Sequence, residues 1–143
     1  MRNLKIVIGS DHAGFELKEK IKQILENLKY EHYDMGTFDK TPVDYPIIAR
    51  GVAGEVADGK FDRGIIVCGS GVGVAMTANK IKEIRAANCN DLYCAKMSRL
   101  HNDANILTLG GRIIGEDLAA EIIKVWLETE FEGGRHQGRV DMI

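Results

Sequence analysis

Short apolar runs alternate along this chain with longer segments in which apolar residues recur at helical spacing. The clearest run is Gly64–Val67, which predicts a strand buried on both faces. Further strands are predicted at 4–9, 30–35, 85–89 and 105–109, and helices at 17–28, 47–56, 75–81, 118–127 and directly after Asp91. Strands that alternate with helices form parallel sheets. The chain therefore predicts an α/β fold, a doubly wound (Rossmann-like) five-stranded parallel sheet with helices on both faces.

Length and composition restrict the possible functions. The 143 residues fit one domain, expected over 1–143 with a C-terminal arm from about residue 129. A formal net charge of -2 argues against a nucleic-acid partner. The amino-terminal residues enter a strand pattern at once, and no long apolar stretch follows. We therefore expect no signal peptide, no membrane partner and a cytoplasmic location.

The cysteines and histidines give no sign of a metal site in the sequence. The three cysteines, Cys68, Cys89 and Cys94, are an odd number, which favours free thiols over disulfides. The chain contains no Cys-x-x-Cys and no His-x-x-x-His. We therefore expect no structural zinc and no other metal.

Polar residues follow several predicted strands at the point where each strand ends. They are Asp11 and His12, then Asp44 and Tyr45, then Cys68 and Ser70, and finally Arg112 after Gly110 and Gly111. The carboxyl ends of parallel strands meet at one edge of the sheet, where ligands bind in such folds. This convergence predicts a site at that edge.

Cys68 lies at the end of a predicted strand and before the glycine-rich loop Gly69–Gly73. The backbone N–H groups of such a loop can hold an anion or a developing oxyanion, and they favour a thiolate. The loop is not the dinucleotide fingerprint, because Val74 stands at the place of the third glycine. The loop Gly9–Gly14 has the spacing of a P-loop but lacks the Lys-Ser/Thr pair. The alternative is that both loops are tight turns and that Cys68 is a buried apolar residue.

Two further segments have two possible interpretations each. His101 either caps the end of a helix or belongs to a polar site with Asn102 and Asp103. The segment 132–139 is either a frayed terminus or a phosphate-binding arm, since Arg135, His136 and Arg139 lie among glycines.

Taken together, these motifs resemble the family of ribose-5-phosphate isomerase B, which also includes subunits of galactose-6-phosphate isomerase. The resemblance runs from Lys5 to about Val140. It rests on Gly9–Phe15, Asp44–Pro46, Cys68–Gly73, Arg99–Asp103 and Glu132–Gln137, in this order.

The resemblance implies that D-ribose 5-phosphate and D-ribulose 5-phosphate are interconverted, as in the non-oxidative branch of the pentose phosphate pathway. It implies no cofactor and a homodimer, and it leaves open whether dimers pair into a tetramer. It also implies that Cys68 abstracts a proton, that His101 helps to open the furanose ring and that Ser70 is the catalytic hydroxyl. The substrate-binding positions implied are Asp11, His12, Tyr45, Gly69, Gly71, Val72, Gly73, Asn102, Arg112, Arg135, His136 and Arg139.

Three alternatives remain open at this stage. The substrate could be a six-carbon sugar phosphate, such as allose 6-phosphate or galactose 6-phosphate. A non-catalytic module that binds a phosphorylated ligand would need the arginines and the glycine loop but not the thiol. A redox sensor would use Cys68 and would want a resolving cysteine. We expect the polar arm at 133–139 to reach the site of a partner subunit, because it has no core of its own.

Overall fold

A single parallel sheet organises the molecule. The computed structural model describes residues 3–143, so the first two residues of the expected domain lie outside the described part. The strands are β1 (Lys5–Ser10), β2 (Glu31–Asp34), β3 (Arg63–Cys68), β4 (Ala86–Asn88) and β5 (Ile106–Gly110), and they form a five-stranded sheet in the order β2-β1-β3-β5-β4. This confirms the predicted doubly wound α/β fold.

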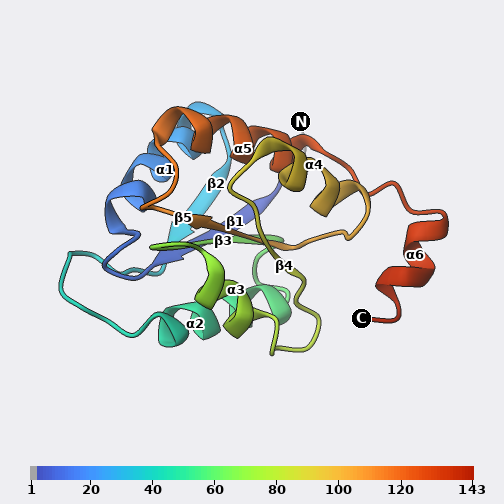
Figure 1. Cartoon of the computed structure of the whole chain (residues 1–143), viewed down its shortest axis with the longest axis horizontal. Coiled ribbons are helices and arrows are strands. Elements are labelled where there is room, and N and C mark those ends of the chain that lie inside the picture. The colour runs from blue at the N-terminus through green and yellow to red at the C-terminus, as the bar shows by residue number, and fades with distance from the viewer. Residues whose placement is uncertain (1–2) are drawn as a thin grey trace.

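Helices cover both faces of the sheet (Figure 1). The helices α1 (Phe15–Asn27), α4 (Leu92–Leu100) and α5 (Glu116–Glu128) lie on one face, and α2 (Tyr45–Ala57) and α3 (Val72–Ala78) on the other. A separate apolar core fills each side, one around Trp126 and the other around Val52. Within residues 3–143 no helix combines the length and the apolar character needed to cross a lipid bilayer.

The burial of each strand follows from its place in the sheet. Every residue of the central strand β3 is buried, as its continuous apolar run predicts. The edge strand β2 alternates between exposed and partly buried residues, which fits its more polar sequence. Asp91 caps α4 as expected, since its Oδ1 accepts the N–H of Cys94 at 2.7 Å.

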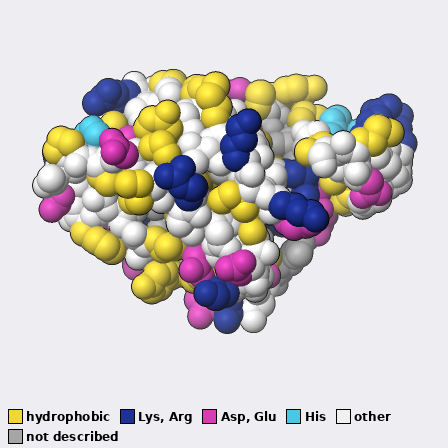
Figure 2. Space-filling view, turned by 90° about the horizontal axis from the view of Figure 1, so that it is seen from below, with side chains coloured by type: hydrophobic (Ala, Val, Ile, Leu, Met, Phe, Trp, Pro, Cys, Tyr) yellow, Lys and Arg dark blue, Asp and Glu magenta, His cyan; other side chains and the backbone are white. Residues whose placement is uncertain are grey.

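Several helix boundaries differ from the sequence prediction, and α1 and α5 each begin two residues earlier than expected. Helix α2 begins at Tyr45 rather than at residue 47, because Pro46 suits the first turn of a helix. Helix α3 spans Val72–Ala78 rather than 75–81 and starts directly after Gly71. A short helix α6 (Arg135–Val140) forms in the polar tail and projects from one side of the body (Figures 1 and 2).

A buried lysine fixes the connection that leads from β2 towards α2. The side chain of Lys18 is fully buried, and its Nζ donates to Asp34 at 2.6 Å and to Glu19 at 3.0 Å. The other oxygen of Asp34 accepts the N–H of Gly36 at 2.8 Å. Ser10, at the end of β1, in turn donates to the carbonyl of Gly36. The ion pair therefore links α1 to the backbone beside the carboxyl end of β1.

We predict that Asp34→Asn lowers the free energy of unfolding at pH 7 by about 3 kcal/mol, because it removes a charged partner of the buried Lys18. Burial by itself raises the pKa of Asp34, but the hydrogen bonds from Lys18 and Gly36 outweigh it, so that the pKa is lowered overall. A depressed folded-state pKa stabilises the fold above the unfolded value and loses this effect as the pH falls. The difference between the two proteins should therefore shrink below about pH 4.

Urea denaturation across this pH range measures the effect. Glu16→Gln is the control, because it breaks an ion pair with Lys40 in which both side chains are exposed. The control should leave the unfolding midpoint unchanged. If the two substitutions lower the free energy of unfolding equally at pH 7, the buried ion pair does not stabilise the fold more than an exposed one.

Candidate active site

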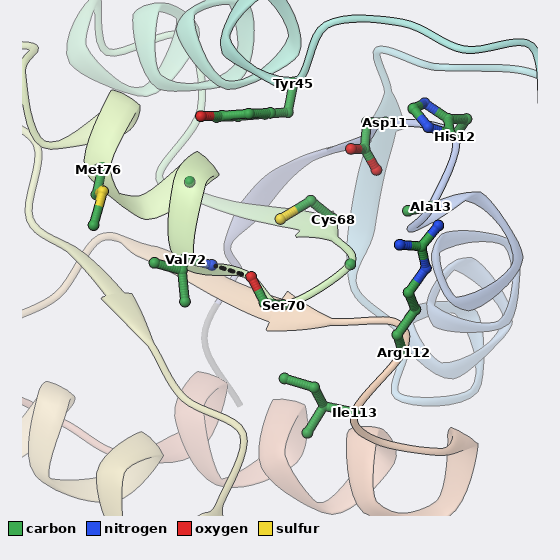
Figure 3. Close-up of a pocket in the computed structure, with 12 residues that line it drawn as sticks. Asp11, His12, Ala13, Tyr45, Cys68, Ser70, Val72, Met76, Arg112 and Ile113 are labelled. Atoms are coloured by element: carbon green, nitrogen blue, oxygen red, sulfur yellow. Dashed lines mark hydrogen bonds between the residues drawn. The ribbon is translucent and has the colours of Figure 1, made fainter.

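A cavity of about 700 Å³ opens at the carboxyl ends of β1 and β3. The strand order reverses between these two strands, and this is where ligands bind in doubly wound folds. The cavity is lined by Asp11, His12, Ala13, Tyr45, Cys68, Gly69, Ser70, Val72, Gly73, Met76, Arg112 and Ile113 (Figure 3). All four residues expected after the first and third strands, Asp11, His12, Cys68 and Ser70, therefore line this cavity.

Cys68 is the last residue of β3 and is 6% exposed. Figure 3 places its sulfur between Tyr45, Asp11 and Ser70. The N–H of Gly71 donates a hydrogen bond to Sγ at 3.1 Å. This bond orients the sulfur and would stabilise a negative charge on it. Among the cysteines, Cys68 is the one that lines this cavity.

The other two thiols have different surroundings. Cys89 is 1% exposed, and burial raises its pKa to about 11. Cys94 is exposed near the start of α4, where the hydrogen bond to Asp91 raises its pKa. Neither has the setting of a general base at neutral pH.

The glycine loop is held in place by Thr108 and Asn90, which the sequence analysis did not select. The hydroxyl of Thr108 donates to the carbonyl of Gly71 at 2.7 Å, and the amide of Asn90 donates to the carbonyl of Ser70 at 3.2 Å. The amide oxygen of Asn90 also accepts the N–H of Gly110 at 2.9 Å. In the sequence, the support of the loop is indicated only by Thr108, which is a polar residue inside an otherwise apolar strand.

Gly71 is required by this geometry. Its φ of +85° lies in the left-handed region, and a Cβ there would lie 2.4 Å from Oδ1 of Asn88. The loop can therefore turn from β3 into α3 within a few residues, so the first turn of α3 stands beside Cys68.

Two of the expected N–H donors of the loop are already used inside it. Gly71 donates to Cys68, and Val72 donates to the hydroxyl of Ser70 at 3.2 Å. The N–H groups of Gly73 and Val74 belong to the first turn of α3, where no helical carbonyl accepts them. The donors that remain available to a ligand therefore lie at the helical end of the loop and on the Ser70 hydroxyl.

Asp11 and His12 come from the end of β1. Asp11 is 6% exposed, and its Oδ1 accepts the N–H of Gly14 at 3.0 Å. The Nδ1 of His12 accepts the N–H of Val43 at 3.2 Å, so the ring proton lies on Nε2. In this arrangement Nε2–H is the hydrogen-bond donor that His12 can offer to a ligand.

Tyr45 and Arg112 form opposite parts of the cavity wall (Figure 3). The ring of Tyr45 packs closely over Gly73, because a Cβ at that glycine would lie 2.5 Å from Cε1 of the ring. Arg112 donates its N–H to the carbonyl of Gly69 at 3.0 Å, and its exposed side chain runs over the same glycine. It gives the cavity a cation that suits a phosphate.

A second group of expected site residues does not line this cavity. The group consists of His101, Asn102, Arg135, His136 and Arg139. His101 follows the last turn of α4 and stacks on His136, with ring centroids 4.2 Å apart and an angle of 14° between the rings. His136 is 4% exposed, so the tail is less separate from the body than its polar sequence indicates.

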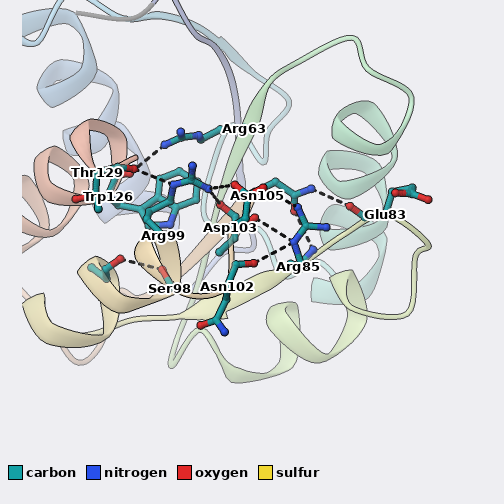
Figure 4. Close-up of polar contacts among 12 residues, drawn as sticks. Arg63, Glu83, Arg85, Ser98, Arg99, Asn102, Asp103, Asn105, Trp126 and Thr129 are labelled. Atoms are coloured by element: carbon teal, nitrogen blue, oxygen red, sulfur yellow. Dashed lines mark hydrogen bonds and ion pairs between the residues drawn. The ribbon is translucent and has the colours of Figure 1, made fainter. Parts of the chain in front are cut away.

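The turn after α4 is tightly held by arginines (Figure 4). Arg85 donates from Nε to the carbonyls of Asn102 and Asp103, at 3.1 and 3.0 Å. Arg99 is 4% exposed and pairs with the Asp103 carboxylate at 2.9 Å. The backbone that carries His101 and Asn102 is therefore fixed relative to the sheet.

Part of the cavity wall consists of apolar residues that were not among the expected site residues. Ala13, Met76 and Ile113 line the cavity, and the side chains of Met76 and Ile113 are 66% and 58% exposed. Leu92 and Tyr93 are further exposed apolar residues at the start of α4. Helical spacing predicts which residues are buried, and it gives no signal for these exposed ones.

The cavity as a whole suits a small phosphorylated polyol. A thiol, a carboxylate and a hydroxyl stand around its centre, and a guanidinium stands at its edge. A carboxylate accepts hydrogen bonds from sugar hydroxyls, whereas a guanidinium binds phosphate. The thiol and the nearby N–H donors can together move a proton beside a carbonyl group.

Comparison with known proteins agrees with this chemistry. Ribose-5-phosphate isomerase B from Escherichia coli K12 is 47% identical over 139 residues, which cover 97% of this chain and 93% of that protein. The structure of ribose-5-phosphate isomerase B from Clostridium thermocellum has 51% identity and a TM-score of 0.95, covering 97% of this chain and 94% of that one. The enzyme from Mycoplasma genitalium, solved with bound ribulose 5-phosphate, has 38% identity and a TM-score of 0.93, covering 99% and 95%.

The family model described as Ribose/Galactose Isomerase matches residues 6–143, nearly the whole chain. This confirms the resemblance carried by the sequence motifs. The chain belongs to the ribose/galactose isomerase family and is a sugar-phosphate aldose–ketose isomerase.

Proposed function

We propose that this isomerase interconverts D-ribose 5-phosphate and D-ribulose 5-phosphate, with Cys68 as the base. The observation that carries the proposal is the position of Cys68 Sγ, which lies in the cavity and accepts the N–H of Gly71. The E. coli relative is named ribose-5-phosphate isomerase B, and the M. genitalium relative binds ribulose 5-phosphate. Both support a five-carbon substrate.

The reaction then needs one base and a set of fixed donors. The Cys68 thiolate removes the proton from C2 of the open-chain aldose, and the C2–H electron pair forms the C1–C2 double bond of an enediolate. The carbonyl pair at C1 moves onto its oxygen, where the Ser70 hydroxyl and the N–H groups of Gly73 and Val74 stabilise the charge. A proton passes from O2 to O1, and the Cys68 thiol returns its proton to C1 to give the ketose.

The remaining groups of the cavity position the substrate. Arg112 and the Nε2–H of His12 bind phosphate oxygens, and Asp11 accepts hydrogen bonds from sugar hydroxyls. The binding energy of the phosphate, which does not react, places C2 over the sulfur. Tyr45 closes the side of the cavity against α3.

The rest of the site comes, in this proposal, from a second copy of the chain. The family resemblance assigns His101, Arg135 and Arg139 to the substrate, yet none of them lines the chain's own cavity. The helix α6 that carries both arginines projects from the body (Figure 2). In a twofold homodimer each arm reaches the other subunit's cavity. His101 there protonates the ring oxygen and opens the furanose.

The exposed apolar residues around the cavity support this arrangement. Val72, Met76 and Ile113 line its rim and are all exposed in the single chain. Leu92 and Tyr93 add to the exposed apolar surface from α4. Packing against a partner would remove these side chains from water.

A six-carbon sugar phosphate is the second candidate, because the matching family is described by both ribose and galactose. The cavity residues that bind phosphate and hydroxyls would serve either substrate. The kcat/KM values for ribose 5-phosphate and for six-carbon sugar phosphates therefore have to be compared to distinguish the two candidates.

We predict that Cys68→Ala lowers kcat for ribose 5-phosphate by at least about a hundredfold, because the general base is lost. Coupled turnover assays measure the rate, and circular dichroism checks that the fold is intact. Cys94→Ser is the matched control, since this thiol is exposed and lies outside the cavity. Iodoacetamide should inactivate the wild type, and ribose 5-phosphate should protect it.

Turnover close to wild type in Cys68→Ala would contradict the mechanism. The substrate assignment is contradicted if kcat/KM for allose 6-phosphate or galactose 6-phosphate exceeds that for ribose 5-phosphate. Phosphosugar binding without turnover of any of these sugars would favour the non-catalytic module.

We predict that Arg135→Ala and Arg139→Ala each raise KM by roughly tenfold or more, since a charge-assisted contact to phosphate contributes about 1.5–3 kcal/mol. Lys124→Ala is the control, because this exposed lysine lies on α5. Steady-state kinetics measure all three variants. A chain truncated after Phe131 that retains the wild-type KM would show that the arm does not bind substrate.

A further inference from the structure

His101, Glu132 and His136 form a cluster of potential metal ligands outside the chain's own cavity. One ligand atom from each residue lies within 4.8 Å of the other two. The three residues come from the end of α4, from the segment before α6 and from α6 itself. His101 lies more than 30 positions before the other two residues in the sequence, so no Cys-x-x-Cys or His-x-x-x-His motif marks the cluster.

The donor set suits a late transition metal. Two imidazoles and one carboxylate bind Zn²⁺ with tetrahedral geometry and leave one position open, whereas Mg²⁺ and Ca²⁺ prefer oxygen ligands. Imidazole ligands also suit Cu²⁺, Ni²⁺ and Co²⁺.

The buried histidine of the cluster is poorly satisfied by its surroundings. His136 is 4% exposed, and within residues 3–143 its Nε2 has no hydrogen-bond partner. The nearest carboxylate oxygen, Oε1 of Glu132, lies 3.6 Å from Nε2. A buried polar atom without a hydrogen bond costs free energy, which a ligand on that atom would recover.

The backbone holds the three residues together, although their rings must move to bind. The N–H of Glu132 donates to the carbonyl of Leu100 at 3.1 Å, which fixes the start of the arm beside His101. The two rings now stack at 14°, so their lone pairs run nearly parallel. Binding requires one ring to turn, and His101 is the more exposed of the two.

We propose that His101, Glu132 and His136 form an inhibitory site for a divalent late transition metal, with Zn²⁺ as its representative. The metal occupies the ring nitrogens that the substrate would use and holds the arm against the end of α4. The inhibition rests on the proposed function, in which His101 opens the sugar ring. The binding itself does not depend on that function.

Calorimetric titration with zinc chloride tests the binding. The parent protein carries Cys68→Ala and Cys94→Ser, because thiolates are strong zinc ligands. The thiol of Cys89 remains, buried and with its pKa raised to about 11. We expect one Zn²⁺ per chain, and at least about tenfold weaker binding in Glu132→Gln and in His136→Asn. Glu121→Gln, an exposed acid on α5, is the matched control and should bind like the parent.

Inhibition is tested in the protein with its native cysteines. Zn²⁺ should inhibit the isomerase, and a chelator should restore the rate. Glu132→Gln should need at least about tenfold more Zn²⁺ to halve its own uninhibited rate.

Several results would overturn the proposal. Equal Zn²⁺ affinity in Glu132→Gln and its parent would exclude the carboxylate as a ligand. Loss of binding in the parent without Cys68 and Cys94 would assign the metal to a thiolate instead. Binding that leaves the isomerase rate unchanged would refute the inhibitory role. If the protein with its native cysteines binds Zn²⁺ normally but does not turn over ribose 5-phosphate, the proposed function is refuted and the metal site stands.

Discussion

The site depends on how the end of β3 is joined to the start of α3. Gly71 adopts a left-handed conformation that brings its N–H onto the Cys68 sulfur, and Thr108 holds its carbonyl from the neighbouring strand. Asn90 ties the same loop to the end of β5. The conformation of Gly71 and the side chains that hold the loop thus place a thiol at the end of a buried strand beside the free N–H groups of a helix. Small residues are needed here because a Cβ at Gly71 or Gly73 would collide with its neighbours.

The residues of the proposed site lie in two separate regions of the chain's surface. The Cys68 thiol, the Asp11 carboxylate and one cation lie around the cavity, whereas His101 and the basic helix α6 lie beyond it. The arginine network around Asp103 and the stacking on His136 hold the second group firmly, so its separation from the cavity follows from the fold. A dimer joins the two groups in our proposal. The same His101–His136 contact, with Glu132 beside it, provides the donor set of the proposed metal site.

Much of this could be predicted from the sequence, for identifiable physical reasons. Continuous apolar runs such as 64–67 mark buried strands, and parallel strands bring their carboxyl ends together, so Asp11, Cys68 and Arg112 were expected at one edge. The stabilising roles of Lys18, Asn90 and Thr108 depend on contacts between distant residues, which no local pattern shows. The orientation of the His12 ring depends on a hydrogen bond from Val43 in a loop. Helix α6 has too little apolar periodicity to be predicted.

In our proposal, a complete site needs Cys68 from one subunit and His101 from the other. Mixing of two variants tests this directly: Cys68→Ala and His101→Asn, each nearly inactive alone, are co-refolded in equal amounts and assayed with ribose 5-phosphate. Half of the dimers then contain one copy of each variant, and each such dimer holds one intact site of its two. We therefore expect about a quarter of the wild-type activity. An activity no higher than that of the separate variants would contradict the account.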